Sequence, residues 1–336
     1  MEQNNYQGAL QKPIGSGFSA KSTAGDVIKG IDLTGKIAII TGGNTGIGLE
    51  TTRTLAAAGA TVIVPARDIG KARKNLQGTE NVELVPMDLM NPDSIDAFAK
   101  NFLASGRPLH ILINNAGIMW VPLRRDQRGI ESQLATNYLA PFQLTARLWP
   151  ALRKANGARV VNVSSYGHQF APFNFDDPNF LNREYETLQG YGQSKTAVNL
   201  FSVELDIRAK SSGVRVYAVH PGSIAGTELA REASLELFQQ MGLCDAEGNL
   251  LPEVAASLKT IPQGAATTVW CATSPMLNQT GGVYCEDVDV AVLSSDAPMS
   301  GGVKLYSLDK TNAKRLWKLS EEMTGLHFLI DSGQSV

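Results

Sequence analysis

A glycine-rich turn directly after a short apolar segment is the feature that most constrains the fold of this chain. Residues 36–40 (Lys-Ile-Ala-Ile-Ile) are rich in β-branched side chains, and Thr-Gly-Gly-Asn-Thr-Gly-Ile-Gly follows at positions 41–48. A helical pattern then runs from Leu49 to Ala58. This order is typical of a phosphate-binding site, because glycines let the backbone approach a pyrophosphate and a helix amino end offers free N–H groups. An ordinary strand-to-helix turn is the alternative.

Strand and helix patterns alternate along the rest of the chain. Apolar runs predict buried parallel strands at residues 37–40, 61–64, 82–86, 109–113, 159–163, 214–219 and 283–285. Helical patterns between them cover residues 46–58, 69–76, 92–104, 126–154, 190–212 and 263–273. The alternation predicts an α/β fold of the Rossmann type, a doubly wound parallel sheet of about seven strands with helices on both faces.

The amino-terminal residues differ in composition from the remainder. Residues 1–34 are expected to form an N-terminal arm, and residues 35–336 a single dinucleotide-binding catalytic domain. The first 22 residues are rich in Gly, Ser, Asn and Gln and predict a loose segment. Thr23 and Asp26 have the spacing of a helix capping box, which predicts a short helix after Thr23.

Composition excludes several classes of function. The 336 residues carry 30 basic and 32 acidic side chains, and the absence of a basic block argues against nucleic-acid binding. Cys244, Cys271 and Cys285 lie far apart, which fits a reducing compartment and argues against a metal site. No apolar stretch reaches the roughly 20 residues of a membrane span, and the polar start is unlike a signal peptide. We therefore expect a cytoplasmic protein without a metal or a membrane span.

A Ser…Tyr-x-x-x-Lys pattern could carry proton transfer. Tyr191 and Lys195 are four residues apart, so on a helix they share a face. A cation about 4 Å from a phenol, at an effective dielectric near 20, favours the phenolate by roughly 4 kcal/mol. The pattern predicts that Lys195 lowers the pKa of Tyr191 from about 10 toward neutrality. By itself, such a pair is more often an ordinary helix surface.

Taken together, these residues resemble the short-chain dehydrogenase/reductase family over about residues 33–290. The motifs occur in the family's order: Thr41-Gly42-x-x-x-Gly46-x-Gly48, Asp88, Asn114-Asn115-Ala116-Gly117, Asn137, Ser165, Tyr191 with Lys195, and Pro221-Gly222. Residues 23–33 and 191–195 look most like its retinol-dehydrogenase-like branch. The resemblance implies an oxidoreductase acting on CH–OH groups, which transfers a hydride between a nicotinamide and a carbonyl or alcohol carbon.

The resemblance also implies roles for four catalytic residues. Tyr191 would be the general acid in reduction and the general base in oxidation, and Lys195 would tune it and hold the nicotinamide ribose. Ser165 would bind the developing oxyanion, and Asn137 would connect a water relay to Lys195. Neighbouring residues of a strand point to opposite faces, which favours Ser165 over Ser164 for this role.

Arg67 bears on the choice of cofactor. It is the first charged residue after the second predicted strand, where an acid binds a ribose 2′-hydroxyl and an arginine accommodates a 2′-phosphate. NADP(H) is therefore favoured, and NAD(H) stays open because Asp68 follows. The other implied cofactor contacts are Gly42, Asn44, Thr45, Gly46, Ile47, Gly48, Asp88, Leu89, Asn115, Ala116, Gly117, Tyr191, Lys195, Pro221, Gly222, Ile224 and Thr227. Thr227 stands one position later than the family's usual threonine.

Several apolar residues suggest a substrate pocket. Residues 224–262 correspond to the family's substrate cover and are expected to form a lid. The candidate pocket residues are Trp120, His168, Phe173, Leu229 and Phe238. Ordinary packing is the alternative for the apolar residues, and a satisfied structural histidine for His168. The interval from Ser165 to Tyr191 is long and aromatic, which favours a fairly bulky, apolar ketone or aldehyde as substrate.

Two other functions remain open. The long interval also occurs among relatives that reduce a porphyrin-like ring, so reduction of another double bond is one alternative. A cofactor-binding sensor or scaffold without turnover is the other, although Ser165, Tyr191 and Lys195 are all retained.

Relatives commonly associate through their two long helices, here residues 126–154 and 190–212. This implies a homodimer or homotetramer, unless the segment 304–325 covers the same surface.

Overall fold

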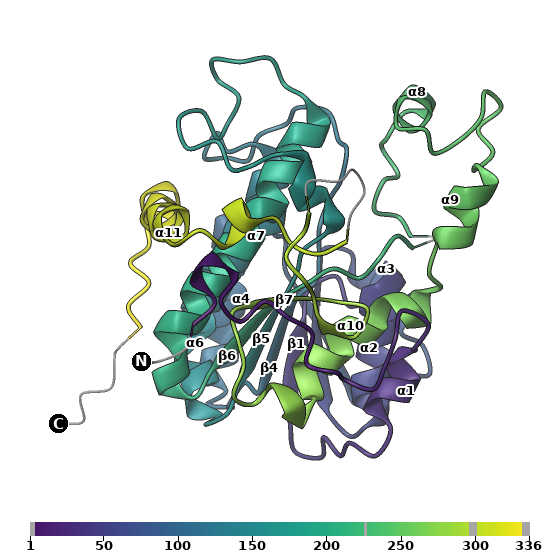
Figure 1. Ribbon diagram of the computed structural model, residues 1–336. Coiled ribbons are helices and arrows are strands. Elements are labelled where there is room, and N and C mark those ends of the chain that lie inside the picture. Colours follow the sequence, from purple (N-terminus) through teal and green to yellow (C-terminus); the bar gives the residue numbers. More distant parts are fainter. Residues whose placement is uncertain (1–3, 225–226, 296–300, 331–336) are drawn as a thin grey trace.

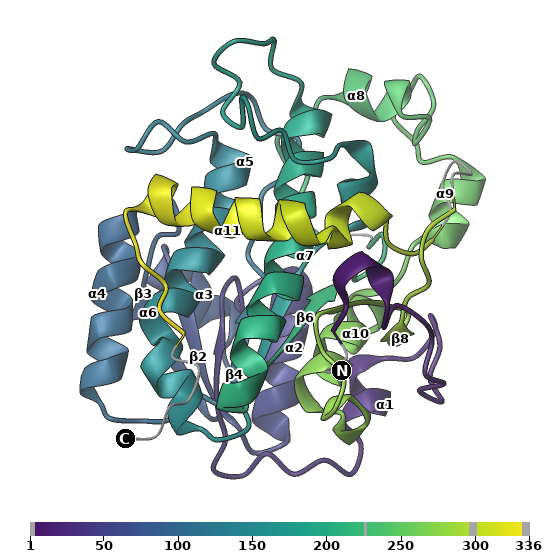
Figure 2. The ribbon, with the colours of Figure 1, turned by 60° about the vertical axis from the view of Figure 1, so that its left-hand side comes forward.

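A single mixed sheet forms the centre of the molecule (Figures 1 and 2). The computed structural model describes residues 4–224, 227–295 and 301–330. Within these residues the sheet has eight strands in the order β3-β2-β1-β4-β5-β6-β7-β8. The strands are β1 (Ile37–Ile40), β2 (Thr61–Ala66), β3 (Val82–Pro86), β4 (Ile111–Asn114), β5 (Arg159–Val163), β6 (Arg215–Val219), β7 (Val283–Glu286) and β8 (Asp289–Val290). All neighbouring pairs are parallel except β7 and β8.

Alternation along the strands divides the core into two layers. Ile39, Leu112 and Val160 contribute to a cluster with α4 (Pro92–Ala104), α6 (Ala140–Lys154) and α7 (Thr187–Ala209). Ile40, Ile113 and Val161 contribute to a second cluster, with α1 (Ala24–Ile28), α2 (Gly46–Ala57) and α10 (Ile261–Thr273). Successive strand residues face opposite sides, so continuous apolar strands require helices on both faces. The predicted doubly wound α/β fold is confirmed, with one strand more than the predicted seven.

The strand that the sequence did not indicate is β8. It pairs with β7 across a turn in which Asp287 and Val288 have φ values of 51° and 63°. Two consecutive left-handed residues fit the tight turn of a hairpin, but Asn-Gly or Asp-Gly normally supplies them. Because Asp-Val lacks that signal, the hairpin could not be expected from the local residues.

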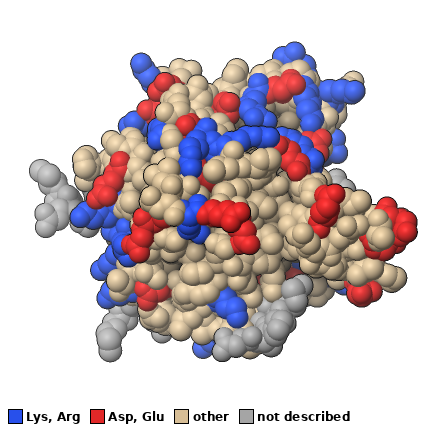
Figure 3. All heavy atoms as spheres, turned by 90° about the horizontal axis from the view of Figure 1, so that it is seen from above, with Lys and Arg blue, Asp and Glu red and all other residues tan. Residues whose placement is uncertain are grey.

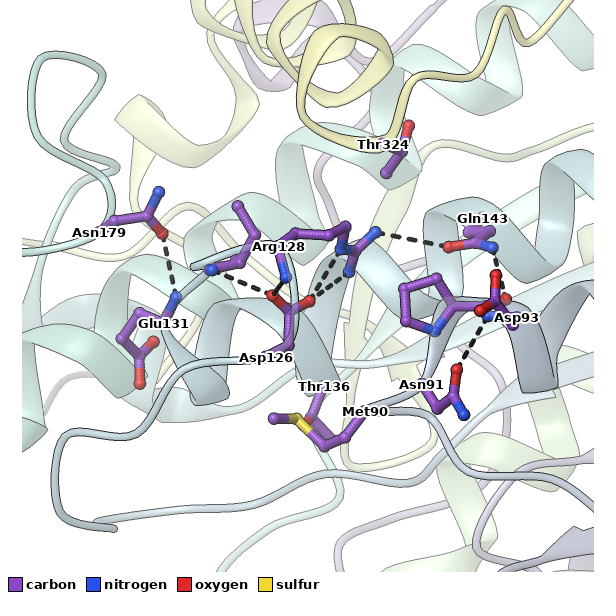
Figure 4. Close-up of polar contacts among 12 residues, drawn as sticks. Met90, Asn91, Asp93, Asp126, Arg128, Glu131, Thr136, Gln143, Asn179 and Thr324 are labelled. Carbon is purple, nitrogen blue, oxygen red and sulfur yellow. Dashed lines mark hydrogen bonds and ion pairs between the residues drawn. The ribbon is translucent and has the colours of Figure 1, made fainter.

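The predicted helix 126–154 begins later than expected. Asp126 closes a turn instead, because its Oδ1 accepts from the backbone N–H groups of Arg128 (2.8 Å) and Ile130 (3.0 Å) (Figure 4). Glu131 then caps α5 (Ser132–Leu134) by accepting from the first N–H groups of that helix. A π-helical turn, Ala135–Leu139, connects α5 to α6.

The first residues are not the loose segment that their composition suggests. Asn5 and Gln11 are buried at the edge of the sheet. Gln11 Nε2 donates to the carbonyl groups of Tyr284 (2.6 Å) and Ala291 (2.7 Å), and its Oε1 accepts from Tyr284 N–H (3.1 Å). The side-chain amide thus satisfies backbone groups that would otherwise be buried without partners. The capping box of Thr23 and Asp26, and the helix α1 after it, are present as predicted.

The carboxyl-terminal helix α11 (Lys310–Thr324) lies across α6 and α7 (Figure 2). Trp317 places its ring 5.4 Å from that of Phe142 in α6 and 6.0 Å from that of Phe201 in α7. The guanidinium of Arg208 in α7 also stacks on Trp317, with its Cζ atom 4.3 Å from the centre of the ring. Association of two chains through α6 and α7 would therefore require α11 to move.

No helix within the described ranges is both long and apolar enough to cross a membrane.

Candidate active site

The predicted functional residues gather at the carboxyl ends of β1, β4 and β5. The strand order reverses between β1 and β4, since β2 follows β1 on one side and β5 follows β4 on the other. In an open parallel sheet, such a reversal leaves a crevice outside the strand ends where ligands bind. The glycine loop, the loop after β4 and the loop after β5 all leave the sheet here.

The glycine loop can be formed only by this pattern of glycines. Gly42 and Gly46 have φ values of 65° and 51°, a conformation that glycine adopts without steric penalty. A Cβ on Gly48 would lie 2.3 Å from the carbonyl oxygen of Gly42. Thr52 in α2 fixes the turn by donating from Oγ1 to the Gly43 carbonyl (2.9 Å).

The amino end of α2 is left without a side-chain cap. Thr45 is its N-cap residue, but the Thr45 side chain makes no capping hydrogen bond to the first-turn N–H groups, which include those of Ile47 and Gly48. By contrast, α1, α4 and α10 all have side-chain caps. The Asn44 carbonyl accepts from Asn75 Nδ2 (3.0 Å), which holds the loop beside α3 (Ile69–Asn75). Free N–H groups and the positive helix end fit a pyrophosphate.

Thr41 joins the glycine loop to the loop after β4. Its Oγ1 accepts from the N–H groups of Asn115 (3.0 Å) and Ala116 (3.1 Å), and Asn115 Nδ2 donates to the Thr41 carbonyl (2.9 Å). The sequence motif contained Thr41 without indicating this role. Its position between a strand end and the first glycine was the available signal.

Asn137 lies in the π-helical turn and connects three elements. Its Oδ1 accepts from Ile118 N–H (2.9 Å), while its Nδ2 donates to the Ile118 carbonyl (3.0 Å) and to Ser194 Oγ in α7 (3.0 Å). A Cβ on Gly117 would lie 3.1 Å from Asn137 Oδ1 and 3.7 Å from Lys195 Nζ. Single π-helical turns are frequent at functional sites. Ser194, which the sequence did not single out, is the anchor of Asn137 on α7.

The residue before Asn137 contacts the loop after β3. Thr136 Oγ1 lies 2.9 Å from Met90 Sδ (Figure 4). Met90 N–H donates to Asp88 Oδ1 (3.0 Å), and Asp88 and Leu89 are partly exposed. The predicted adenine-contacting loop is therefore held against the helix that carries Asn137.

Ser165, Tyr191 and Lys195 lie together, as predicted. Ser165 Oγ accepts from Gly167 N–H (2.9 Å) and is hydrogen-bonded to the Tyr191 side chain. Lys195 Nζ donates to the Val163 carbonyl (2.8 Å) and lies 5.6 Å from the centre of the Tyr191 ring. A Cβ on Gly167 would be 2.4 Å from Tyr191 Cε1, so this close approach depends on glycine.

Ser164 faces the other way. Its Oγ is buried and contacts the Lys195 carbonyl at 3.4 Å, not the Tyr191 phenol. The alternation that favoured Ser165 is therefore present in the structure.

The predicted effect of Lys195 on Tyr191 is wrong for this structure. Burial raises the pKa of Tyr191 to about 12, and the hydrogen bond with Ser165 offsets only part of this change. Burial also lowers the pKa of Lys195 to about 7. The expected lowering of the Tyr191 pKa requires a fully charged lysine in a moderately polar medium. With Tyr191 only 2% and Lys195 only 4% exposed, loss of hydration disfavours both charged forms.

Arg67 and Asp68 have different environments at the end of β2. The Arg67 side chain is exposed, and no partner for it is found in the part of the chain that the structure describes. Asp68 Oδ1 instead accepts from Lys71 N–H (2.8 Å) and caps α3. Lys71 forms an ion pair with Glu228 (2.9 Å), which links α3 to the region predicted as a lid.

The segment after β6 returns to the glycine loop. Pro221 precedes Gly222, which has a φ of 91° and lies against the Lys259 side chain. Ile224 forms a parallel bridge with Lys259, and residues 225–226 are outside the described ranges. Thr227 Cγ2 would be 3.7 Å from a Cβ on Gly46. Thr227 is therefore next to the glycine loop, despite its displaced position in the motif.

Two of the predicted pocket residues meet. The rings of Trp120 and Phe238 are 5.5 Å apart in an edge-to-face arrangement. Phe238 belongs to α8 (Leu235–Gln240), and Leu229 lies earlier in the same region with 37% of its surface exposed. Arg124 forms an ion pair with Glu232 (2.6 Å), which joins the Trp120 loop to this region a second time.

The other two pocket candidates lie elsewhere. Phe173 packs on Phe175 (4.8 Å) within the cluster of α4, α6 and α7, and it lines a surface hollow with Arg183 and Arg315. Phe173 is part of the packing of this cluster and takes no part in the Trp120–Phe238 contact.

His168 is a structural residue. It is fully buried, its Nδ1 bonds to the Ser165 carbonyl (2.7 Å), and its Nε2 accepts from Lys304 N–H (3.1 Å). Because a carbonyl only accepts, Nδ1 carries the proton. Burial lowers the pKa of His168 to about 4, so the ring stays neutral. With both nitrogens engaged, it cannot contact a substrate as the sequence suggested.

In the described ranges, no group of three or more His, Cys, Asp or Glu side chains is arranged to hold a metal ion.

Comparisons with known proteins identify the family. The short chain dehydrogenase family matches residues 36–237. A Streptomyces lividans protein named as a probable oxidoreductase is 42% identical over 295 residues, which cover 86% of this chain and 97% of that protein. Human retinol dehydrogenase 12 is 38% identical over 315 residues, covering 92% of each chain.

A solved structure has a similar fold. The crystal structure of an uncharacterized protein from Mycobacterium paratuberculosis has a TM-score of 0.70 and 31% identity, covering 91% of this chain and 98% of that one. The family uses a nicotinamide cofactor, and the glycine loop, the uncapped α2 and Gly117 fit one. The chain is an oxidoreductase acting on CH–OH groups and belongs to the short-chain dehydrogenase/reductase family, in its retinol-dehydrogenase-like branch.

Proposed function

We propose that this enzyme is an NADP-dependent reductase of fairly bulky, apolar ketones or aldehydes. The observation that carries the proposal is the group of Ser165, Tyr191 and Lys195 beside the crevice of the sheet, in which Tyr191 and Lys195 are buried and Ser165 is partly exposed. A sensor or scaffold without turnover would have no need to bury the phenol of Tyr191 and the ammonium of Lys195, since the burial of such polar groups is unfavourable.

Tyr191 is suited to donate a proton. With its pKa raised to about 12 by burial, the phenol keeps its proton at neutral pH. When bound, the nicotinamide supplies or accepts the hydride. In reduction, Tyr191 Oη gives its proton to the substrate oxygen as that oxygen gains charge, and Ser165 Oγ–H stabilises the same oxygen. Oxidation would need a phenolate at the start, which burial disfavours, so reduction is the favoured direction.

Lys195 and Asn137 position the group. Lys195 Nζ is held by the Val163 carbonyl on one side and lies near Gly117 on the other. Its place between Tyr191 and the loop after β4 suits contact with a nicotinamide ribose. Asn137 binds Ile118 and Ser194, which fixes that loop relative to α7.

Preference for NADP(H) is supported by the free guanidinium of Arg67. An arginine pairs well with a 2′-phosphate, in charge-assisted hydrogen bonds. The nearby carboxylate that could instead bind a ribose hydroxyl, Asp68, is engaged in capping α3.

The substrate proposal rests on the region 224–262, which we propose as the lid. Trp120 and Phe238 form an aromatic contact between the lid and the loop after β4. Relatives named as retinol dehydrogenases support a large apolar substrate. Basic and acidic side chains intermingle over much of the face in Figure 3, while those on its right-hand part, which carries the lid, are mostly acidic, so the lid has no basic field to attract a highly negative substrate.

The first prediction concerns the proton donor. Tyr191→Phe removes only the phenol oxygen, so turnover of dodecanal with NADPH should fall by at least about 100-fold, the usual value of general acid catalysis. NADPH binding and thermal stability should be nearly unchanged. Steady-state kinetics, with cofactor saturation confirmed, would measure the loss. A variant that kept most of its rate would show that Tyr191 is not the proton donor.

The serine pair provides a matched control for the same assay. Ser165→Ala should reduce turnover by about 100-fold or more, if it binds the oxyanion. Ser164→Ala should have a much smaller effect, because its Oγ contacts only the Lys195 carbonyl. Equal losses in the two variants would argue against the role of Ser165.

The second prediction concerns cofactor choice. Arg67→Asp should weaken NADPH binding by about tenfold or more, the value of a charge-assisted hydrogen bond, and shift preference toward NADH. Dissociation constants from cofactor fluorescence would show the change. Arg73→Asp alters the charge of α3 equally at another exposed site and should leave the preference intact. Unchanged NADPH affinity in Arg67→Asp would remove Arg67 from the cofactor site.

The third prediction concerns stability and pH. The pKa of Lys195 is about 7 in the folded protein against 10.5 in the reference state. Between these values the unfolded chain binds more protons, so the stability of the wild type should rise with pH, by up to about 1.4 kcal/mol per pH unit. Lys195→Met lacks this group. Without added nucleotide, the stability of wild type relative to Lys195→Met should therefore increase from pH 7 upward.

Urea unfolding at several pH values would measure this difference. A difference that stays constant over the window would show that Lys195 titrates normally and is not buried as described.

A further inference from the structure

Trp120 is a buried aromatic residue outside the hydrophobic core. It is 7% exposed, yet it belongs to none of the three hydrophobic clusters of the described chain. Its indole Nε1 is shielded from solvent and has no hydrogen-bond partner among the described residues. A buried tryptophan normally finds an acceptor, and leaving a buried donor unpaired costs about 1–3 kcal/mol. The indole N–H is thus a hydrogen-bond donor that the described part of the protein does not use.

The backbone of Trp120 is held in an unfavourable conformation. Its φ is 57°, in the left-handed region that bulky residues rarely adopt. Gln133 Oε1 accepts from Trp120 N–H (3.0 Å), and the next carbonyl, of Val121, accepts from Tyr185 Oη (3.0 Å) and Thr187 Oγ1 (2.9 Å). Strain of this kind persists only where the surroundings over-determine it, and it is concentrated at functional sites.

The location of Trp120 connects it to the reaction. It follows Gly117, which approaches Lys195 Nζ and Asn137, by three residues on the same loop. Its other side meets Phe238 of the proposed lid, with the ring planes at 74°. Trp120 is therefore on the same loop as Gly117 and in contact with the proposed lid, and a substrate held under the lid would reach it with the part remote from the reacting carbon.

Two other tryptophans show that an unpaired N–H alone is not informative. Trp149 and Trp270 also have buried Nε1 atoms without partners. However, Trp149 lies in α6 and Trp270 in α10, each inside a hydrophobic cluster and with ordinary helical backbone. Only Trp120 combines the free donor with a strained backbone and a contact to the lid.

We propose that the Trp120 indole N–H binds a second oxygen of the substrate, remote from the carbonyl group that is reduced. The substrate class is then an apolar aldehyde or ketone that carries another acceptor oxygen, such as an ether, carbonyl or hydroxyl, and not a plain hydrocarbon chain. This inference rests on the proposed carbonyl-reductase function. A buried donor discriminates well, because a substrate without the acceptor leaves the N–H unpaired.

The test uses an acceptor that is moved along a fixed chain. Dodecanal is compared with analogues in which an ether oxygen replaces one methylene at successive positions, with NADPH as reductant. Trp120→Phe removes the N–H and keeps a ring to pack on Phe238. The ratio of kcat/KM in wild type to that in Trp120→Phe for dodecanal, which has no second oxygen, sets the baseline and includes any loss of packing. It should rise by about 3- to 10-fold, the value of one hydrogen bond, at one or two adjacent ether positions.

Trp149→Phe is the matched control, because it removes an equally unpaired N–H inside the core. The ratio of kcat/KM in wild type to that in Trp149→Phe should be the same for dodecanal and for every ether analogue. Thermal unfolding and the KM for NADPH should be alike in wild type and Trp120→Phe, which separates recognition from misfolding. If the wild type reduces these aldehydes but the kcat/KM ratio of wild type to Trp120→Phe is the same for every member of the series, this inference alone is overturned. No turnover of any member by the wild type would overturn the proposed function and this inference with it.

Discussion

The burial of Tyr191 and Lys195 against the end of β5 is the constraint on which the rest of the site depends. Lys195 reaches the Val163 carbonyl, and Tyr191 fits over Gly167, where any larger residue would collide with the ring. Removing water from this place raises the pKa of the phenol and lowers the pKa of the ammonium. In our account the Tyr191 phenol therefore keeps its proton at neutral pH, with Ser165 as its hydrogen-bonding partner.

Around this pair, the polar groups of the scaffold are mostly engaged with one another. Asn137 is used by Ile118 and Ser194, Asp68 caps its own helix, and both nitrogens of His168 are bonded. Among the donors without a partner in the described part of the chain are the N–H groups of the uncapped first turn of α2, the Arg67 guanidinium and the Trp120 indole. In our account these are the groups that meet pyrophosphate, 2′-phosphate and substrate. Recognition is then a matter of which donors the fold leaves unpaired.

Local spacing made much of this predictable. The glycine loop, the parallel strands and the Ser165, Tyr191 and Lys195 group follow from patterns within short stretches of sequence. Most of what could not be predicted depends on contacts between distant residues. The acceptor role of His168 Nε2 is set by Lys304, and the packing of the amino-terminal residues by Gln11 at β7. The late start of the helix before Asn137 has a local cause instead, the turn closed by Asp126, which the helical pattern did not reveal. The pKa of Tyr191 was misjudged because spacing reports proximity and not burial.

The central claim is that Tyr191 holds its proton at neutral pH and donates it. The most direct test is the ionisation of that one phenol, followed by NMR of protein labelled with carbon-13 at the tyrosine Cζ, with Tyr191→Phe used to assign the signal. The account predicts that the Tyr191 signal shows no titration up to the ordinary tyrosine pKa of about 10, in keeping with a value near 12. A titration midpoint close to neutrality would contradict it, and would mean that the charge of Lys195 outweighs burial.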